Sequence, residues 1–118
     1  MNTDNTVFLF LDDCRIPSDC AKYMRQRNID GSIYLKNWII VRSYNEFVEW
    51  IEQNGLPDVI SFDHDLGNDL SGMDCAKWLI NYCLDNCKSL PLYAVHSANP
   101  PGAANIEGLF KSYIKLKE

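Results

Sequence analysis

Four short runs of apolar residues divide the chain into segments of similar length. Each run is continuous rather than alternating, which is typical of strands buried on both faces of a parallel sheet. The predicted strands are 7–11, 38–41, 57–62 and 92–95. A further short strand is expected at 32–35, shortly before the second run.

Patterns with a helical period lie between and after these runs. Apolar residues recur at i, i+3, i+4 and i+7 from Tyr44 and again from Ile106, so each set forms one stripe on a helix. Ser43 and Ser71 each precede an acidic residue three positions later, which is typical of a capped helix start. A weaker stripe predicts another helix over 19–28.

Strands that alternate with helices across short connections predict an α/β fold. We expect a three-layer, open parallel sheet of about four strands, with helices on both faces. At 118 residues the chain is long enough to bury one core, so a single domain over 1–118 is predicted. Ligands of such sheets bind beyond the carboxyl ends of the strands, which is where functional residues are expected.

Composition narrows the class of protein. With 47% hydrophobic and 23% charged residues the chain is globular, and a formal net charge of −5 argues against an extended nucleic-acid surface. The polar start and the short apolar run after it predict neither a signal peptide nor a membrane span, and therefore a cytoplasmic protein. Five irregularly spaced cysteines are a poor disulfide framework, so small core residues or inert thiols are expected.

Charged and polar side chains follow the predicted strands. The set comprises Arg42 after the second strand, Asp12, Asp13 and Arg15 after the first, Asp63, His64 and Asp65 after the third, and His96, Ser97 and Asn99 after the fourth. Because the carboxyl ends of parallel strands meet at one edge, we expect these side chains to lie close together.

The acidic members of this set predict a metal site. Carboxylates that lie close together repel one another unless a cation neutralises them. Their hard oxygen ligands suit Mg²⁺ or Mn²⁺, and we expect Asp12, Asp13 and Asp63 to bind it. Asp65 either joins them or is a turn residue before Gly67, and both interpretations stay open.

The remaining members predict phosphate binding and catalysis. Arg15 would hold a phosphate through paired hydrogen bonds, with Ser97 and Asn99 as further contacts. His96 would act as a general acid or base, or would be only a buried, hydrogen-bonded residue at a strand end. Asp63 would act either through a metal-bound water or as a covalent phosphoryl acceptor.

The layout of these motifs resembles the receiver domain of two-component response regulators. An acidic pair follows the first strand, and PDVISFD is similar to the receiver motif that ends in the phosphoacceptor, here Asp63. LPLYAVHSA resembles the fourth receiver strand, with Ser97 at the hydroxyl position. Receivers also have a fifth strand that ends in a lysine, and the residues after Ser97 contain no candidate for it.

A divergent receiver group resembles the chain more closely. LDDCRIP, ISFDHDLG, GMDCAKWL and VHSANPPG are similar to the signatures of cyclic-phosphate processing receiver domains. This resemblance implies a receiver-like or flavodoxin-like sheet without the usual fifth strand. It also implies a metal-dependent phosphoesterase, or a binding protein, for a cyclic phosphate on a small molecule, nucleotide or RNA end.

Two other functions stay open. The chain would serve as a signalling module if Asp63 accepted a phosphoryl group from a donor. It would instead be a non-catalytic binding module if its main role were assembly, with a homodimer formed through the sheet edge at 92–95.

Overall fold

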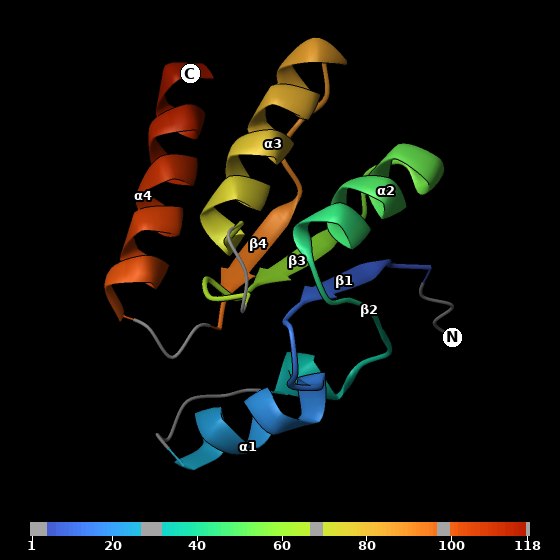
Figure 1. The fold of residues 1–118 in the computed structure, drawn as a ribbon, viewed down its shortest axis with the longest axis vertical. Helices are drawn as coiled ribbons and strands as arrows, with labels where there is room; N and C mark the ends of the chain where they lie inside the picture. The colour runs from blue at the N-terminus through green and yellow to red at the C-terminus, as the bar shows by residue number, and fades with distance from the viewer. Residues whose placement is uncertain (1–4, 27–31, 67–69, 97–99, 118) are drawn as a thin grey trace.

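Four parallel strands form one sheet in the order β2-β1-β3-β4 (Figure 1). The structure is a computed structural model, and it describes residues 5–26, 32–66, 70–96 and 100–117. Its elements are β1 (Phe8–Leu11), α1 (Pro17–Gln26), the 3₁₀ turn η1 (Ser32–Leu35), β2 (Trp38–Val41), α2 (Tyr44–Asn54), β3 (Val59–Phe62), α3 (Gly72–Asp85), β4 (Leu92–Val95) and α4 (Pro100–Lys117). None of the helices in these ranges is long and apolar enough to cross a membrane.

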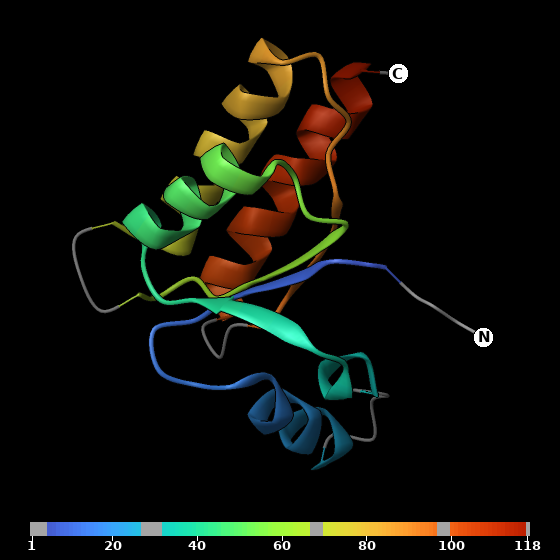
Figure 2. The same cartoon turned by 90° about the vertical axis from the view of Figure 1, so that its right-hand side faces the viewer.

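Helices cover both faces of the sheet. α2, α3 and α4 lie on one face, and α1 lies with η1 on the other (Figures 1 and 2). The chain moves one way along the sheet from β1 to β2 and the other way from β2 to β3 and β4, so right-handed crossovers place α1 opposite α2 and α3. The predicted α/β fold is confirmed, and its switch point lies between β1 and β3.

Side chains of the central strands alternate between two cores. Leu11 and Phe62 join the larger core, which also contains residues of α2, α3 and α4. Phe10 joins the smaller core with residues of α1 and η1. Ser61, next to Phe62 along β3, faces this smaller core as well, because its hydroxyl contacts Tyr34 of η1. Apolar residues on both faces explain why the strands read as continuous apolar runs.

The predicted starts of two helices are confirmed. At α3, Ser71 and Asp74 exchange side-chain and backbone hydrogen bonds, which completes the capping box. At α2, the Ser43 side chain accepts the backbone N–H of Glu46, while the Glu46 carboxylate accepts the backbone N–H of Arg42. The second helix therefore has its cap and is also tied to the end of β2.

The strand expected at 32–35 is wrong, because this segment is the 3₁₀ turn η1. Its apolar residues Ile33 and Leu35 are 37% and 65% exposed, whereas Tyr34 between them is buried. The indole N–H of Trp38 donates to the carbonyl of Ile33 at 3.0 Å. Local bonds of this kind hold the turn.

The helix predicted over 19–28 is present as α1 but begins two residues earlier, at Pro17. Proline is favoured at the first helical position, where its fixed φ suits the helix and its missing N–H has no partner to lose. Asp19 accepts the backbone N–H of Ile16 at 3.1 Å, which ties α1 to the preceding loop. The helix therefore begins close to the end of β1.

The five cysteines all lie in the described ranges, and none of them forms a disulfide bond. Cys20, Cys75 and Cys83 are buried, as expected for small core residues. Burial raises the pKa of the Cys20 thiol to about 11 and that of the Cys75 thiol to about 12. These two thiols are therefore protonated at neutral pH and unreactive.

Candidate acidic site

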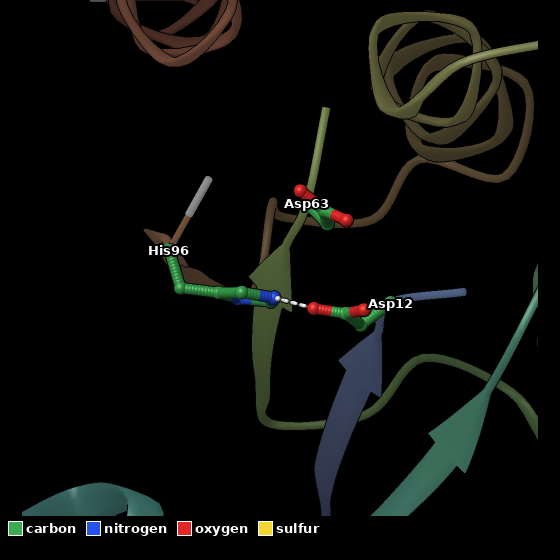
Figure 3. Close-up of side chains that lie close together, drawn as sticks. All are labelled: Asp12, Asp63 and His96. Carbon is green, nitrogen blue, oxygen red and sulfur yellow. Dashed lines mark hydrogen bonds and ion pairs between the residues drawn. The ribbon is translucent and has the colours of Figure 1, made fainter. Parts of the chain in front are cut away.

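Three polar side chains follow β1, β3 and β4 at equivalent positions. Asp12, Asp63 and His96 each come directly after the last residue of a strand. The sheet hydrogen bonds continue through them, since the Asp63 N–H donates to the Leu11 carbonyl and the His96 N–H to the Phe62 carbonyl, both at 3.0 Å. The three side chains converge beyond the strand ends (Figure 3). This edge is where ligands of such sheets bind.

The acidic residues form two overlapping groups. One ligand atom from each of Asp12, Asp63 and His96 lies within 4.8 Å of the others. The same holds for Asp12, Asp13 and Cys14. Asp12 and Asp63 are only 0% and 5% exposed, whereas Asp13 lies at the surface. The structure therefore brings together Asp12 and Asp63, with Asp13 beside them.

The Asp12 carboxylate accepts four hydrogen bonds. Its Oδ1 accepts the backbone N–H groups of Cys14 at 3.0 Å and Arg15 at 2.8 Å. Its Oδ2 accepts Arg15 Nε and His96 Nε2, both at 3.0 Å. Burial acts to raise the pKa of Asp12, but the bonds from His96 and the two N–H groups, with the charge of Arg15, outweigh it and hold that pKa below its usual range. Asp12 is therefore ionised at neutral pH.

Asp63 lies beside Asp12, and its negative charge is stabilised less than that of Asp12. Arg15 Nη2 lies 3.5 Å from Asp63 Oδ1, so one guanidinium spans both carboxylates. Burial and the negative charge of Asp12 raise the pKa of Asp63, while His96 and Arg15 act in the opposite direction. Two neighbouring carboxyls with oppositely shifted pKa values are typical of functional sites.

Arg42 braces the loop that carries these groups. Its Nη1 donates to the carbonyl of Asp12 at 3.1 Å and to the carbonyl of Arg15 at 2.7 Å. The sequence predicts Arg42 among the polar residues that gather at the strand ends. In the structure its bonds are to backbone carbonyls, so it supports the loop from the end of β2.

His96 is buried and bonded through both ring nitrogens. Its Nε2 bonds to Asp12, and its Nδ1 lies 2.6 Å from Ser61 Oγ, which lies 2.9 Å from the Tyr34 hydroxyl. The ring stacks on Phe10 with centroids 4.5 Å apart. Sequence analysis missed Ser61 and Tyr34, although a serine within the third apolar run was a usable signal. The predicted acid–base role of His96 stays a prediction.

Two glycines allow α3 and α4 to pack against the end of β3. A Cβ on Gly72 would clash with the Asp63 carbonyl oxygen, and the Gly72 N–H donates to the His64 carbonyl at 2.7 Å. A Cβ on Gly102 would clash with the His64 ring. The first turn of α3 therefore packs against the backbone of Asp63 and His64, and the first turn of α4 packs against the His64 side chain.

Three predicted site residues gain no support from these contacts. Asp65 is exposed, bonds to His64 Nδ1 at 2.9 Å and belongs to neither acidic group of the described residues. Ser97 and Asn99 lie outside the described residues. Metal binding by Asp65 and phosphate binding by Ser97 and Asn99 stay predictions.

The chemistry of the acidic donors suits a hard divalent cation. Asp12, Asp13 and Asp63 offer only oxygen atoms, which favour Mg²⁺ or Mn²⁺. Two buried carboxylates side by side also need positive charge nearby, and Arg15 supplies a single unit to both. The residues therefore fit a divalent cation held between the carboxylates.

The strand order and the acidic residues after β1 and β3 define a receiver-like α/β domain. A family model described as the cyclic-phosphate processing receiver domain matches residues 7–112. The chain belongs to this family, which confirms the resemblance seen in its motifs. The described residues form the four-stranded sheet expected for a receiver without its fifth strand.

Solved structures resemble the chain in fold. One is a fusion that carries amino acids 181–211 of the yeast Spc42 trimeric coiled coil; it is 14% identical, with a TM-score of 0.55, and the match covers 98% of this chain and 80% of that chain. At this identity the likeness supports the fold alone. No curated protein matches the chain.

Proposed function

We propose that the chain binds Mg²⁺ or Mn²⁺ together with a cyclic phosphate, on a nucleotide or an RNA end, and hydrolyses a phosphoester of that ligand. One observation carries this proposal: the buried carboxylates of Asp12 and Asp63 lie together, spanned by Arg15, at the ligand-binding edge of the sheet. The family description supplies the class of ligand.

The proposal gives each charged group a role. Asp12, Asp13 and Asp63 would hold the cation, and Asp12 would exchange one of its four hydrogen bonds to do so. When bound, a divalent cation neutralises phosphate oxygens and makes a bound water more acidic. The Arg15 side chain is 29% exposed beside both carboxylates, and its guanidinium would pair with the phosphate in bidentate fashion.

Residues on the loops after β3 and β4 complete the proposed site. Asp65 is a further candidate for an oxygen ligand, and Ser97 and Asn99 are candidates for contacts to the phosphate. The net charge of −5 favours a small phosphate ligand or a single RNA end over a long nucleic-acid duplex.

Calorimetric titration of Mn²⁺ and Mg²⁺ into the wild type, Asp63→Asn and Asp85→Asn tests the metal site. Asp85→Asn is the matched control, because it removes the same charge from an exposed residue at the far end of α3. We expect metal binding by the wild type and the control, and binding weaker by at least about tenfold for Asp63→Asn, since it loses a charged ligand.

The same titrations with a 2′,3′-cyclic nucleotide present test the ligand, and chromatography of the nucleotide tests its hydrolysis. We expect nucleotide binding only with metal present, followed by ring opening that Asp63→Asn lacks. Absence of metal binding, with or without nucleotide, would contradict the proposal.

A second candidate function is phosphoryl transfer to Asp63 itself. The position of this buried carboxyl directly after β3 favours it, because the receiver motif places the phosphoacceptor there. Incubation with acetyl phosphate and Mg²⁺, followed by mass spectrometry, would then show one added phosphoryl group that Asp63→Asn lacks. An adduct without turnover of any cyclic nucleotide would favour signalling over hydrolysis.

A further inference from the structure

A series of hydrogen bonds crosses the smaller core from η1 to the acidic site. The Tyr34 hydroxyl lies 2.9 Å from Ser61 Oγ, Ser61 Oγ lies 2.6 Å from His96 Nδ1, and His96 Nε2 lies 3.0 Å from Asp12 Oδ2. None of the four residues is more than 5% exposed. Polar groups at such depth are costly unless each is bonded, and in this series each one is.

The carboxylate at one end fixes the direction of its hydrogen bond to His96. An ionised carboxylate only accepts, so His96 Nε2 carries the hydrogen and donates to Asp12. In the tautomer that carries its hydrogen at Nε2 alone, the ring accepts at Nδ1, which makes Ser61 the donor to His96 and Tyr34 the donor to Ser61. In this tautomer every donor points toward Asp12.

Packing holds the His96 ring in the plane that this bond requires. Phe10 stacks on it at an interplanar angle of 6°, and the Tyr34 ring meets it edge-on at 77°. The His96 side chain is 0% exposed, and both of its nitrogens are engaged inside the fold. A ring held in this way is suited to orienting a neighbour rather than to exchanging protons with a ligand.

We propose that Tyr34, Ser61 and His96 are positioning residues that orient the Asp12 carboxylate toward the cation and Arg15. Asp12 passes this orientation on, because it holds both the backbone N–H and the Nε of Arg15. His96 thus acts through Asp12 and not on the substrate. The cation in this proposal rests on the proposed function, whereas the hydrogen-bonded series does not. Groups that orient metal ligands typically contribute about 10–100-fold to metal affinity.

Mn²⁺ titration tests this role with substitutions at Ser61 and Tyr34, which are buried in the smaller core and are not proposed to contact the cation. We expect binding about tenfold weaker for Ser61→Ala and about threefold weaker for Tyr34→Phe, because each removes a donor from the series. Ser61→Thr keeps the hydroxyl and should restore affinity to within about twofold of the wild type. Wild-type affinity in both Ser61→Ala and Tyr34→Phe would overturn the proposal.

Tyr113→Phe is the control for loss of a buried tyrosine hydroxyl. Tyr113 is 8% exposed near the end of α4 and lies outside the series, so its variant should bind Mn²⁺ as the wild type does. Equal weakening in Tyr113→Phe would show that the loss reflects stability alone and would overturn the positioning role.

Nitrogen-15 NMR of the imidazole rings, recorded without metal, tests the series independently of the proposed function. The chain has two histidines, so His64→Gln leaves only the His96 signals. We expect a ring protonated at Nε2 with a bare Nδ1, and a shifted Nδ1 signal after Ser61→Ala. If the wild type binds no Mn²⁺, the proposed function fails, but the spectrum still tests the hydrogen-bonded series. Unchanged His96 signals in Ser61→Ala would overturn the series, and shifted signals would support it.

Discussion

Asp12 and Asp63 have carboxylate oxygens less than 5 Å apart, but their negative charges affect the stability of the fold in opposite directions. Asp12 is ionised and accepts four hydrogen bonds, whereas Asp63 is buried beside it and, among the described residues, has one long side-chain contact, to Arg15. The same change, from aspartate to asparagine, should therefore shift the free energy of unfolding in opposite directions at the two positions.

Asp63→Asn should stabilise the metal-free protein at neutral pH. Because burial and Asp12 raise the pKa of Asp63 in the folded state, its charge costs folding free energy at every pH above that value. We expect a gain of about 1 kcal/mol, or roughly 4 °C in melting temperature. The gain should shrink as pH falls from neutral through the raised pKa of folded Asp63 toward the unfolded value near 3.9, since the folded carboxyl becomes neutral first. Thermal melts across this range measure it, and a lower melting temperature at pH 7 would show that the ion pair with Arg15 dominates.

Asp12→Asn should destabilise the protein by about 3 kcal/mol, because the amide nitrogen would face N–H donors from His96, Arg15 or the backbone. The lowered pKa of Asp12 contributes stability above its unfolded value near 3.9, and this contribution is lost as pH falls toward the folded value. The difference from wild type should therefore narrow in acid. Urea unfolding measures it, with Asp85→Asn as the control. A wild-type midpoint for Asp12→Asn would contradict the hydrogen-bond arrangement.

At the scale of elements, the start of α3 fixes the site by its close approach to β3. Alanine is normally favoured over glycine in a helix, but at Gly72 an added Cβ meets the Asp63 carbonyl. We expect Gly72→Ala to lower stability by about 2 kcal/mol and to weaken Mn²⁺ binding, because the Asp63 backbone must move. Chemical unfolding and calorimetry measure the two effects.

Gly108 provides the matched control within α4. A Cβ there meets no atom within 4 Å, so Gly108→Ala should raise stability by roughly 0.5–1 kcal/mol and leave Mn²⁺ affinity unchanged. Equal gains at both glycines would show that α3 has room to shift without disturbing Asp63.

At the scale of the whole molecule, β4 ends the sheet of described residues and offers a surface for a second copy. It pairs with β3 on one side, and its Leu92 is 74% exposed. An edge strand is self-complementary across a two-fold axis, so we predict a concentration-dependent dimer through β4. Leu92→Lys should shift the dimer toward monomer, while Leu84→Lys, at an exposed site on α3, should not. Sedimentation velocity measures both, and a wild-type monomer at high concentration would refute the dimer.

The sequence predicted most of the sheet and part of the site, for physical reasons. The strands 38–41 and 92–95 have the predicted bounds, although these edge strands are only partly buried. The central strands β1 and β3 are buried on both faces, as their continuous apolar runs predicted. Asp12 and Asp63 were found because parallel strands bring their carboxyl ends together.

The parts that the sequence did not predict depend on contacts between distant segments. η1 is held against the smaller core by Tyr34, and Ser61 meets His96 only because β3 and β4 pair in one particular register. Neither relation leaves a periodic pattern in the local sequence. The direction of the hydrogen bonds around Asp12 likewise follows from tertiary structure.

The two cores, one on each face of the sheet, should differ in their tolerance to mutation, because the smaller one contacts His96 of the acidic site. The larger core is built from apolar side chains that exchange with one another at modest cost when volume is kept. The smaller core packs Phe10 and Tyr34 directly against His96. A random substitution in this layer therefore alters the acidic site as well as the packing. Evolutionary drift should concentrate in the larger core, apart from the start of α3 that contacts Asp63.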